Sequence, residues 1–548
     1  MAMANSQSTN LAPTSAEATN DANDHLQKQP QAFDSLEEKI KLDIEHAVVE
    51  NDPRIWSMTR KNLVLCIISG ASMIAGLSAN IQNPANAQIE QELHASSGDI
   101  SLSLSLFILV QGNFPVIWSA VSEIKGRKLV YLLSVALFTL GSVIVAISKT
   151  IGLVIGMRIV QAAGSSAVIA IGAATLADIY EPHQRGTMMG VYYSAPLLGP
   201  SIGPLLGGGL TQGLDWRAVF WFLVIWGAII FLAFLILFKD TFRRERSLTY
   251  QNVLKRRIRE QSLAKSKANS QDTVIHPSAE EPKGTKNERA PEVQDLEAQA
   301  TIPVPSASAI KEVTLSLADV NPFPPYLKII ARKNNFAILV PSGLLFAFSF
   351  SIAYTCARTL ADSYQYDALK TGLVLLAYGI GIVAGSILGG RWSDRTLARL
   401  KAKHGGKSYP EMRLESTKVA MWWLPPSVIG YAWVCQERVH VAAMCVMLFL
   451  AGFFSIWIYT STLAYIVDAN VGRSSTAVAT NSSFRGASAF VAAEVAVPLQ
   501  DAIGDGGLYT LWAGLLIIAQ LLILLVLYKG AKWREESEAR EKLKSESQ

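Results

Sequence analysis

The sequence predicts an all-α membrane protein whose twelve transmembrane helices form two six-helix bundles that repeat one another. Half of the 548 residues are apolar, only 17% are charged, and the mean hydropathy is +0.27. The apolar residues come in runs of about twenty, the length that an α-helix needs to cross roughly 30 Å of hydrocarbon. Because lipid cannot pair with backbone polar groups, runs of this length must be helical.

The runs fall into two sets of six, and each set predicts one bundle. The amino-terminal bundle, residues 61–239, contains runs at 63–81, 100–121, 129–147, 151–176, 187–210 and 219–238. The carboxyl-terminal bundle, residues 334–528, contains runs at 336–356, 372–390, 419–435, 441–467, 477–499 and 508–528.

Three polar segments flank the bundles. Residues 1–60 lack the basic-then-apolar layout of a cleavable signal and are expected to form a disordered tail. Residues 240–333 predict a mostly disordered central loop, which opens with a basic amphipathic stretch at 250–258 suited to a membrane surface. Residues 529–548 form a carboxyl-terminal tail.

The distribution of lysine and arginine predicts the orientation, because cytosolic connections retain positive charge. One set of connections is rich in basic residues, whereas the opposite set holds only Lys149, Arg217, Arg358, Lys370 and Arg438. Both termini and the central loop are therefore expected in the cytosol. The plasma membrane is favoured, and the vacuolar membrane stays open because no sorting signal is legible.

Composition argues against several classes of function. The four cysteines have no metal-ligand spacing, and the seven histidines lie outside the apolar centres, so we expect no metal, no cofactor and no enzyme. The chain has no phosphate-binding loop, which argues against an ATP-binding domain. A net charge of +5 without aromatic-interleaved basic patches argues against a nucleic-acid partner. The expected partners are a small-molecule substrate, protons and the bilayer, and the chain is expected to be a monomer.

Two loops at matching places in the bundles carry similar charges. Residues 122–128 place Glu123 beside Arg127, and residues 390–395 place Asp394 beside Arg395. A carboxylate at the cytosolic end of a helix, followed by basic residues, suits a charge latch between halves that rock against each other. We therefore expect both acids near the ends of spans from the other half. The alternative is ordinary cytosolic positive charge with an incidental acid.

The fourth run carries Arg158 about two turns from its outer end, with Gln161 one turn further on. A guanidinium at that depth is costly unless it faces a cavity or a partner, so it is a candidate functional residue. The alternative is that the side chain snorkels to the interface. Asn80 and Gln111 add neutral polar side chains to the same bundle.

Small residues mark one face of the fifth and eighth runs. The stripes are Gly199, Gly203 and Gly207, with Pro204, and Gly381, Gly385 and Gly389. Glycines four residues apart allow a neighbouring helix to approach closely, and proline bends the helix. We expect the two runs to cross through these stripes, and the alternative is small-residue packing without a role in transport.

The eleventh run places Asn481, Arg485 and Ser488 on about one helical face. Glu494 follows nine residues after Arg485 and faces roughly away from it, so it cannot neutralise the guanidinium. An unpaired cation in a low dielectric favours an anionic partner, which predicts an acidic or zwitterionic substrate. The alternative is that Arg158 and Arg485 are structural braces bonded to carbonyls and polar groups.

These residues together resemble the major facilitator superfamily, and within it the fungal twelve-span drug:proton antiporters, which include exporters of organic acids and amino acids. The resemblance covers about 54–532. Residues 122–128 resemble the family's loop motif, with Glu123 in place of the usual Asp. Residues 199–210 match its antiporter motif, and Arg158, Gln161 and Gly164 match the motif associated with proton coupling.

The resemblance also covers charged helix ends, which the family packs against the loop latches. The matching residues here are Asp178 and Arg185 after the fourth run, and Asp468 and Arg473 after the tenth.

The resemblance implies the major facilitator fold and a proton-coupled exporter of a small organic solute, an organic acid, an amino acid or a drug, that works by alternating access. Glu494, Arg485 and Arg158 are then candidates for proton coupling or the substrate cavity. Import on the same fold and a non-transporting nutrient sensor are the alternatives. A membrane acyltransferase is disfavoured because no histidine lies within the apolar runs.

Overall fold

The computed structural model describes residues 51–243, 250, 323–406, 409–470 and 473–546. The regular secondary structure of this part of the chain is entirely helical, which confirms the all-α membrane fold class. The expected tail at 1–60 and central loop at 240–333 lie largely outside the described residues, as does most of the amphipathic stretch at 250–258.

The chain divides into two compact units. One consists of residues 1–51 and 243–274, and in it Arg243 Nη2 donates a hydrogen bond to the carbonyl oxygen of Asn51 at 2.9 Å. The other consists of residues 52–242 and 275–548 and holds the long helices of both predicted bundles.

The amino-terminal half begins with a short 3-10 helix and ends with α9. Its elements are η1 (Pro53–Ile55), α2 (Met58–Asn80), η2 (Asn83–Ala85), α3 (Asn86–Leu93), α4 (Ser97–Asn113), α5 (Pro115–Lys125), α6 (Arg127–Ala146), α7 (Ile151–Ile179), α8 (Pro182–Gly213) and α9 (Trp216–Ile236). Ser96 starts α4 with a capping box shared with Asp99. The second expected run is divided at Pro115, which lacks a backbone N–H and begins α5.

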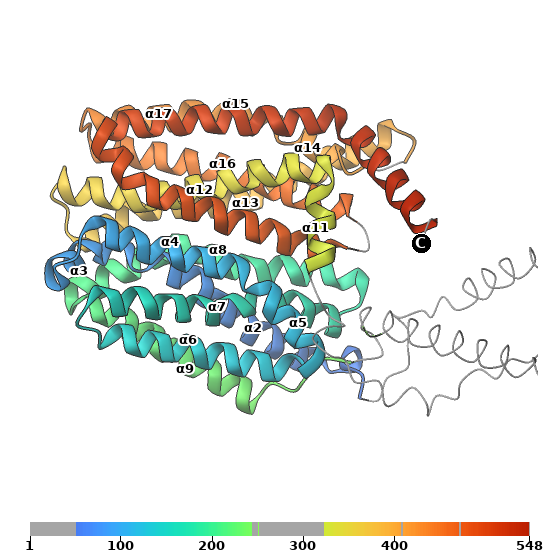
Figure 1. The fold of residues 1–548 in the computed structure, drawn as a ribbon, viewed down its shortest axis with the longest axis horizontal. Coiled ribbons are helices and arrows are strands. Elements are labelled where there is room, and N and C mark those ends of the chain that lie inside the picture. The colour runs from blue at the N-terminus through green and yellow to red at the C-terminus, as the bar shows by residue number, and fades with distance from the viewer. Residues whose placement is uncertain (1–50, 244–249, 251–322, 407–408, 471–472, 547–548) are drawn as a thin grey trace, which may run out of the picture. The chain divides into compact units, whose positions relative to one another are not determined.

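The carboxyl-terminal half follows the same plan (Figure 1). Its elements are α11 (Phe323–Ala331), α12 (Lys333–Asp362), α13 (Ala368–Lys403), α14 (Met412–Glu415), α15 (Lys418–Gln436), α16 (Val441–Ala469) and α17 (Ser474–Glu546). Asp367 caps α13 by accepting the N–H of Lys370 at 2.8 Å, and this bond holds the pKa of the Asp367 carboxyl below its usual value. α17 contains the last two expected runs, separated at Gly504, whose φ of 69° suits glycine.

Helices thus occupy all twelve expected runs, and nine helices in the described ranges are long and apolar enough to cross a membrane. α17 counts once among the nine although it holds two runs. The runs in α8 and α15 fall outside the nine, and both of these helices contain internal prolines.

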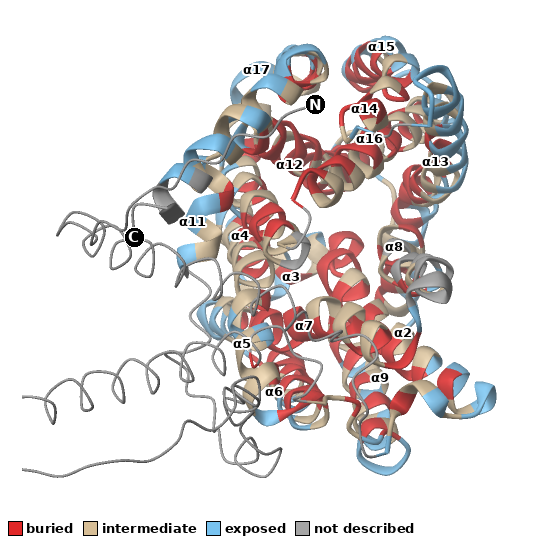
Figure 2. Cartoon of the chain, turned by 90° about the vertical axis from the view of Figure 1, so that its right-hand side faces the viewer, coloured by how far each residue is buried: buried red, intermediate tan, exposed pale blue. Residues whose placement is uncertain are grey.

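Two hydrophobic cores form, one centred on each half, and the first also includes a few residues of α12 and α17. In the amino-terminal half, Tyr131 stacks on Phe234 with ring centroids 4.3 Å apart, and in the carboxyl-terminal half Tyr431 meets Tyr509 edge to face at 4.7 Å. Figure 2 shows buried residues on the inward faces and exposed ones on the outward faces. Large apolar side chains such as Trp422 are exposed on the outside, as expected for helices that face lipid.

Two helix pairs join the halves: α4 packs along α17, and α8 packs along α13. A methyl group on Gly112 of α4 would lie 2.7 Å from the Cα of Gly486 in α17. Such contacts require residues without side chains. Below, the end of the helices near α3 is called the α3 end, and the opposite end, near α11, is called the α11 end (Figure 1).

The glycine stripes do not meet each other, so the expected contact between them is wrong. A methyl group on Gly199 would lie 2.1 Å from the carbonyl carbon of Gly76, and one on Gly207 would lie 1.9 Å from the carbonyl oxygen of Ile81, both at α2. Gly203 also faces α2. A regular spacing identifies a smooth helix face but not the neighbour that covers it.

The second stripe faces α16. Gly381, Gly385 and Gly389 approach Phe449, Phe453 and Trp457, respectively. α8 and α13 nevertheless pack closely, through other small residues: a methyl group on Gly372 would lie 2.3 Å from the carbonyl oxygen of Pro204, and one on Gly379 would lie 2.1 Å from the Cα of Ser201.

Candidate functional site

Arg158 is completely buried within the amino-terminal half. Its Nη1 donates hydrogen bonds to the carbonyl oxygen of Ser78 and to Gln161 Oε1, both at 2.9 Å. Its guanidinium carbon lies 4.2 Å from the ring centre of Phe107. Nε and Nη2 have no partner, and no acid pairs with Arg158 in the part of the chain that the structure describes. The contacts suit a structural brace, and the two unpartnered nitrogens suit a binding group.

The other polar residues predicted in this half connect helices. Gln111 Nε2 donates to the carbonyl oxygen of Ala75 at 3.0 Å and to Ser165 Oγ at 3.2 Å, so it joins α4 to α2 and α7. Asn80 Nδ2 donates to the carbonyl oxygen of Gly76 within its own helix, at 3.0 Å. Both amides therefore already have partners.

Arg485 lies between two aromatic rings of the carboxyl-terminal half. Its guanidinium carbon is 3.8 Å from the ring centre of Phe346 and 4.8 Å from that of Tyr459. Nη1 donates to the hydroxyl of Tyr459 at 2.7 Å, whereas the buried Nε has no partner. Among the described residues, no acid forms an ion pair with Arg485. The aromatic faces hold the cation in place without neutralising it.

Asn481 lies one turn before Arg485 and is buried. Neither its side-chain oxygen nor its side-chain nitrogen has a hydrogen-bond partner in the described structure. Buried amides are normally bonded, so an unpartnered one requires an explanation such as a ligand or a water molecule. Arg485 and Asn481 together offer donors and an acceptor on one face of α17, whereas Phe346 and Tyr459, from α12 and α16, could not be assigned to this site from sequence spacing alone.

Glu494 faces the amino-terminal half. Its carboxylate is hydrogen-bonded to the hydroxyl of Ser105 on α4. One turn away, Ser101 Oγ donates to the carbonyl oxygen of Ala493 at 2.5 Å. Glu494 thus lies in the contact between α4 and α17 and bonds there, rather than to Arg485.

In the amino-terminal loop, Arg127 pairs with Asp178 of its own half. Nε of Arg127 lies 3.3 Å from Asp178 Oδ2, and Nη1 donates to Ser122 Oγ at 2.5 Å. Gly126 has a φ of 86°, and a methyl group there would lie 2.1 Å from Asp240 Oδ2, so the turn requires glycine. Glu123 Oε2 is buried without a partner in the described residues.

The carboxyl-terminal loop contains a matching pair. Arg413 Nε lies 2.8 Å from Asp468 Oδ2, and Arg413 Nη1 lies 3.3 Å from Asp394 Oδ1. Asp394 therefore has a basic partner within its own half, and its expected place near the ends of spans from the other half stays a prediction. Arg395 is exposed, and the side chain of Arg185 lies outside the described residues.

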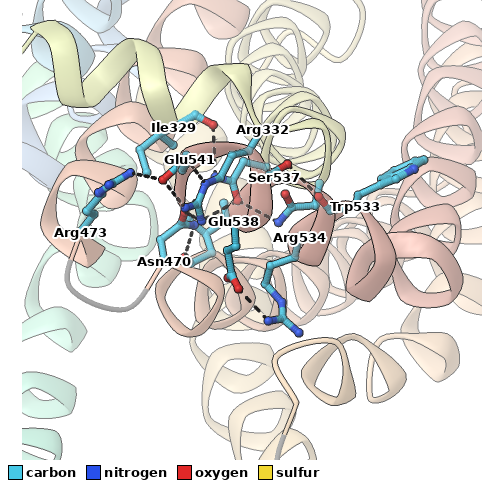
Figure 3. A network of polar contacts seen from close by, with 12 residues as sticks. Ile329, Arg332, Asn470, Arg473, Trp533, Arg534, Ser537, Glu538 and Glu541 are labelled. Carbon is cyan, nitrogen blue, oxygen red and sulfur yellow. Dashed lines mark hydrogen bonds and ion pairs between the residues drawn. The ribbon is translucent and has the colours of Figure 1, made fainter. Parts of the chain in front are cut away.

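Arg473 belongs to a network that sequence analysis missed (Figure 3). Glu541, near the end of α17, binds Arg332 through both carboxylate oxygens at 2.9 and 3.0 Å and also binds Arg473 at 3.0 Å. A cavity of about 310 Å³ lies beside these arginines. Glu541 was not identified because residues 529–548 were assigned to a tail. The four-residue spacing of Arg534 and Glu538, which is typical of an ion pair on a helix, is a sequence signal that α17 continues there.

Comparison with known sequences identifies a family. The sequence profile of the Major Facilitator Superfamily matches residues 68–406. The MFS antiporter QDR3 of Candida albicans is 28% identical, over 88% of this chain and 80% of its own length. Citrate exporter 1 of Aspergillus niger is 26% identical over 90% of both chains, and Quinidine resistance protein 3 of Saccharomyces cerevisiae is 25% identical over 88% of this chain and 84% of its own.

Solved structures show the same fold at low sequence identity. The human organic anion transporter MFSD10 aligns with a TM-score of 0.54 at 16% identity, over 84% of this chain and 99% of its own. A D-xylose-proton symporter aligns with a TM-score of 0.56 at 11% identity, over 84% of this chain and 97% of its own. These likenesses establish the architecture alone.

Proposed function

Because the chain belongs to the Major Facilitator Superfamily, a family of membrane transporters and not of enzymes, we propose that it exports a small organic solute in exchange for protons. Its relatives include antiporters, drug efflux pumps and citrate exporters. Alternating access between the two halves would move the solute, with substrate bound between them. Import on the same fold remains the alternative direction.

In this proposal all twelve helical runs cross the membrane. The bundles comprise residues 61–239 and 334–528, and the α11 end faces the cytosol together with both termini. The excess of lysine and arginine at that end supports this orientation. The plasma membrane is the proposed location.

An acidic or zwitterionic solute suits the geometry around Arg485. The observation that carries this proposal is a guanidinium fixed between Phe346 and Tyr459 with a buried, unpartnered Nε. A planar guanidinium can bind a carboxylate through two parallel hydrogen bonds. Asn481, one turn away, adds a donor for a second polar group of the solute.

Arg158 has a different proposed role. Its hydrogen bonds to Ser78 and Gln161 hold α2 against α7. Gln161 Nε2 in turn donates a hydrogen bond to Ser142 Oγ at 2.7 Å. We place Arg158 and Gln161, with Asn80 and Gln111, in the framework that shapes the substrate cavity and supports proton coupling.

The charged loops are proposed to stabilise the α11 end of each half. Arg127 with Asp178, and Arg413 with Asp468, each tie a loop to the end of the fourth helix of its own half. The latch would then act by keeping each half rigid while the halves move.

Flux measurements with two probes test the proposal. The purified protein is reconstituted in liposomes with a pH gradient, and the movement of radiolabelled citrate and of quinidine is followed. We expect uphill citrate movement that collapses when an ionophore removes the gradient. Movement of quinidine alone would favour a drug exporter. Flux that does not depend on the pH gradient would refute proton coupling. If no compound from a panel of acids, amino acids and drugs moved, a non-transporting nutrient sensor would be favoured.

A further inference from the structure

Three polar contacts between the halves lie on one face of α4. The carbonyl oxygen of Ser97 accepts a hydrogen bond from the hydroxyl of Tyr354 at 3.1 Å. Ser101 and Ser105 follow at intervals of four residues, which places them on the same face. They bond to the carbonyl oxygen of Ala493 and to Glu494 of α17. Only the last of these three contacts includes an acid.

The hydroxyl of Ser105 has one hydrogen but two neighbours that can accept it. Its Oγ lies 3.0 Å from the carbonyl oxygen of Leu102 and also contacts the carboxyl group of Glu494. An ionised carboxylate can only accept, whereas a protonated one can donate. Both contacts are satisfied when Glu494 is protonated. Its carboxyl O–H then donates a hydrogen bond to Ser105 Oγ, and the Ser105 hydroxyl donates one to the carbonyl oxygen of Leu102.

The other charged groups nearby come from three elements. Tyr354 of α12 interacts electrostatically with Glu494, with Arg358 of the same helix, with Glu90 of α3 and with Asp501 of α17. Arg358 is already paired with Asp501 at 2.7 Å. The face of α4 that meets Glu494 supplies serine hydroxyls, and its one acid, Asp99, is bonded to Ser96. Among the described residues, therefore, no cation that would keep Glu494 ionised is in direct contact with it.

Two other acids in the helices bond within their own half. Asp178 pairs with Arg127, and Asp505 accepts hydrogen bonds from Thr359 and Gln500 at 2.9 and 2.7 Å. Their environments need not change when the halves move apart. The contact of Glu494 must break when α4 and α17 separate at the α3 end, because its partner belongs to the opposite half.

We propose that Glu494 carries the transported proton and that Ser105 recognises its protonated form when the α3 end closes. This inference rests on the proposed proton-coupled export. With the α3 end open, the Glu494 carboxylate takes one proton from the outer water. Closure places the neutral acid against Ser105, and the proton leaves to the cytosolic side once that side is accessible. A neutral acid costs far less to bury than a carboxylate, which makes closure dependent on the proton.

The test uses liposomes that contain the full-length protein and whichever of citrate or quinidine the wild-type protein carries. Glu494→Gln replaces the acid by an amide that can still donate to Ser105 but cannot release a proton. We expect uphill flux driven by the pH gradient to be lost, while exchange of labelled for unlabelled solute without a gradient persists and becomes independent of pH. Gradient-driven accumulation by this variant would overturn the proposal.

Two serine variants provide a matched pair. Ser105→Ala removes the acceptor for the protonated acid, so the pH of half-maximal flux should fall by up to about one unit, the effect of one lost hydrogen bond to the protonated form. Ser101→Ala removes a hydroxyl from the same contact but leaves Glu494 untouched, and its pH profile should keep its midpoint. Equal midpoints for the two variants would contradict the proposal, even if Glu494→Gln were inactive in every assay.

The wild-type result separates the two levels of the account. Wild-type flux that is independent of the pH gradient refutes the proposed function itself. Wild-type flux that follows the gradient, together with an unchanged gradient dependence in Glu494→Gln, refutes only the assignment of the proton to Glu494.

Discussion

Arg413 Nε lies 2.8 Å from Asp468 Oδ2, and this pair ties the connection after α13 to the end of α16. The amino-terminal half contains its counterpart, in which Arg127 ties the connection after α5 to the end of α7 through Asp178. The repeat of the two halves therefore extends from the helices to the charged loops. In each half the basic residue of the loop meets an acid of its own half.

Replacing Arg413 tests whether this pair affects the balance between conformations. Partly exposed ion pairs contribute about 0.2–1 kcal/mol, so Arg413→Gln should change the ratio of the two access states by up to about fivefold. Labelling of single cysteines placed at the α3 and α11 ends measures that ratio. Arg395→Gln is the control, because Arg395 is exposed and follows Asp394 directly in α13. Equal labelling in both variants would show that the pair plays no part in the balance.

Two neighbouring glycines of α8 test the contact with α2. A methyl group on Gly207 would lie 1.9 Å from the carbonyl oxygen of Ile81, whereas one on Gly209 would meet nothing within 4 Å. Gly207→Ala forces the helices apart. Such overpacking lowers the free energy of unfolding by about 1–3 kcal/mol, so the melting temperature should fall by several degrees. Gly209→Ala should leave it unchanged. The measurement is thermal unfolding in detergent, and similar melting temperatures would mean that α2 and α8 do not meet at Gly207.

The network at Glu541 predicts that the end of α17 is part of the folded structure. Glu541→Gln weakens the contacts with Arg332 and Arg473 and leaves two partly buried cations less well neutralised. We expect a loss of about 1–2 kcal/mol, which corresponds to a lowering of the melting temperature by a few degrees.

Glu535→Gln removes the same charge from an exposed position of the same helix and serves as the control. A melting temperature that falls equally in both variants would mean that net charge, and not the bond to the arginines, is responsible. Limited proteolysis should also cleave the Glu541→Gln variant earlier near its carboxyl terminus.

The helices were predictable because each apolar run is long enough to demand a helix in lipid. The identity of helix neighbours was not, since the spacing of Gly199 and Gly207 identifies a face and not the helix that covers it. The loop acids show the same limit. The loop motif contained Asp394 but gave no sign of its partner Arg413, which lies nineteen residues further along the chain.

The burial and hydrogen-bond partners of the intramembrane polar residues could not be predicted from the sequence either. The depth of Arg158 indicated a special residue, but its bonds to Ser78 and Gln161 depend on how α2 packs on α7. Glu494 was recognisable as an acid within an apolar run, whereas Ser105 is one of several serines in α4. Only the packing of α4 on α17 selects it.

The most direct test of the account is the flux of citrate and quinidine through Arg485→Lys. Lysine keeps the positive charge but loses the planar fork that binds a carboxylate through two hydrogen bonds. We predict that pH-driven citrate flux falls about tenfold or more, the effect of losing a charged hydrogen bond, while quinidine flux is spared. Loss of quinidine flux with unchanged citrate flux would contradict the proposal that Arg485 binds an anionic solute.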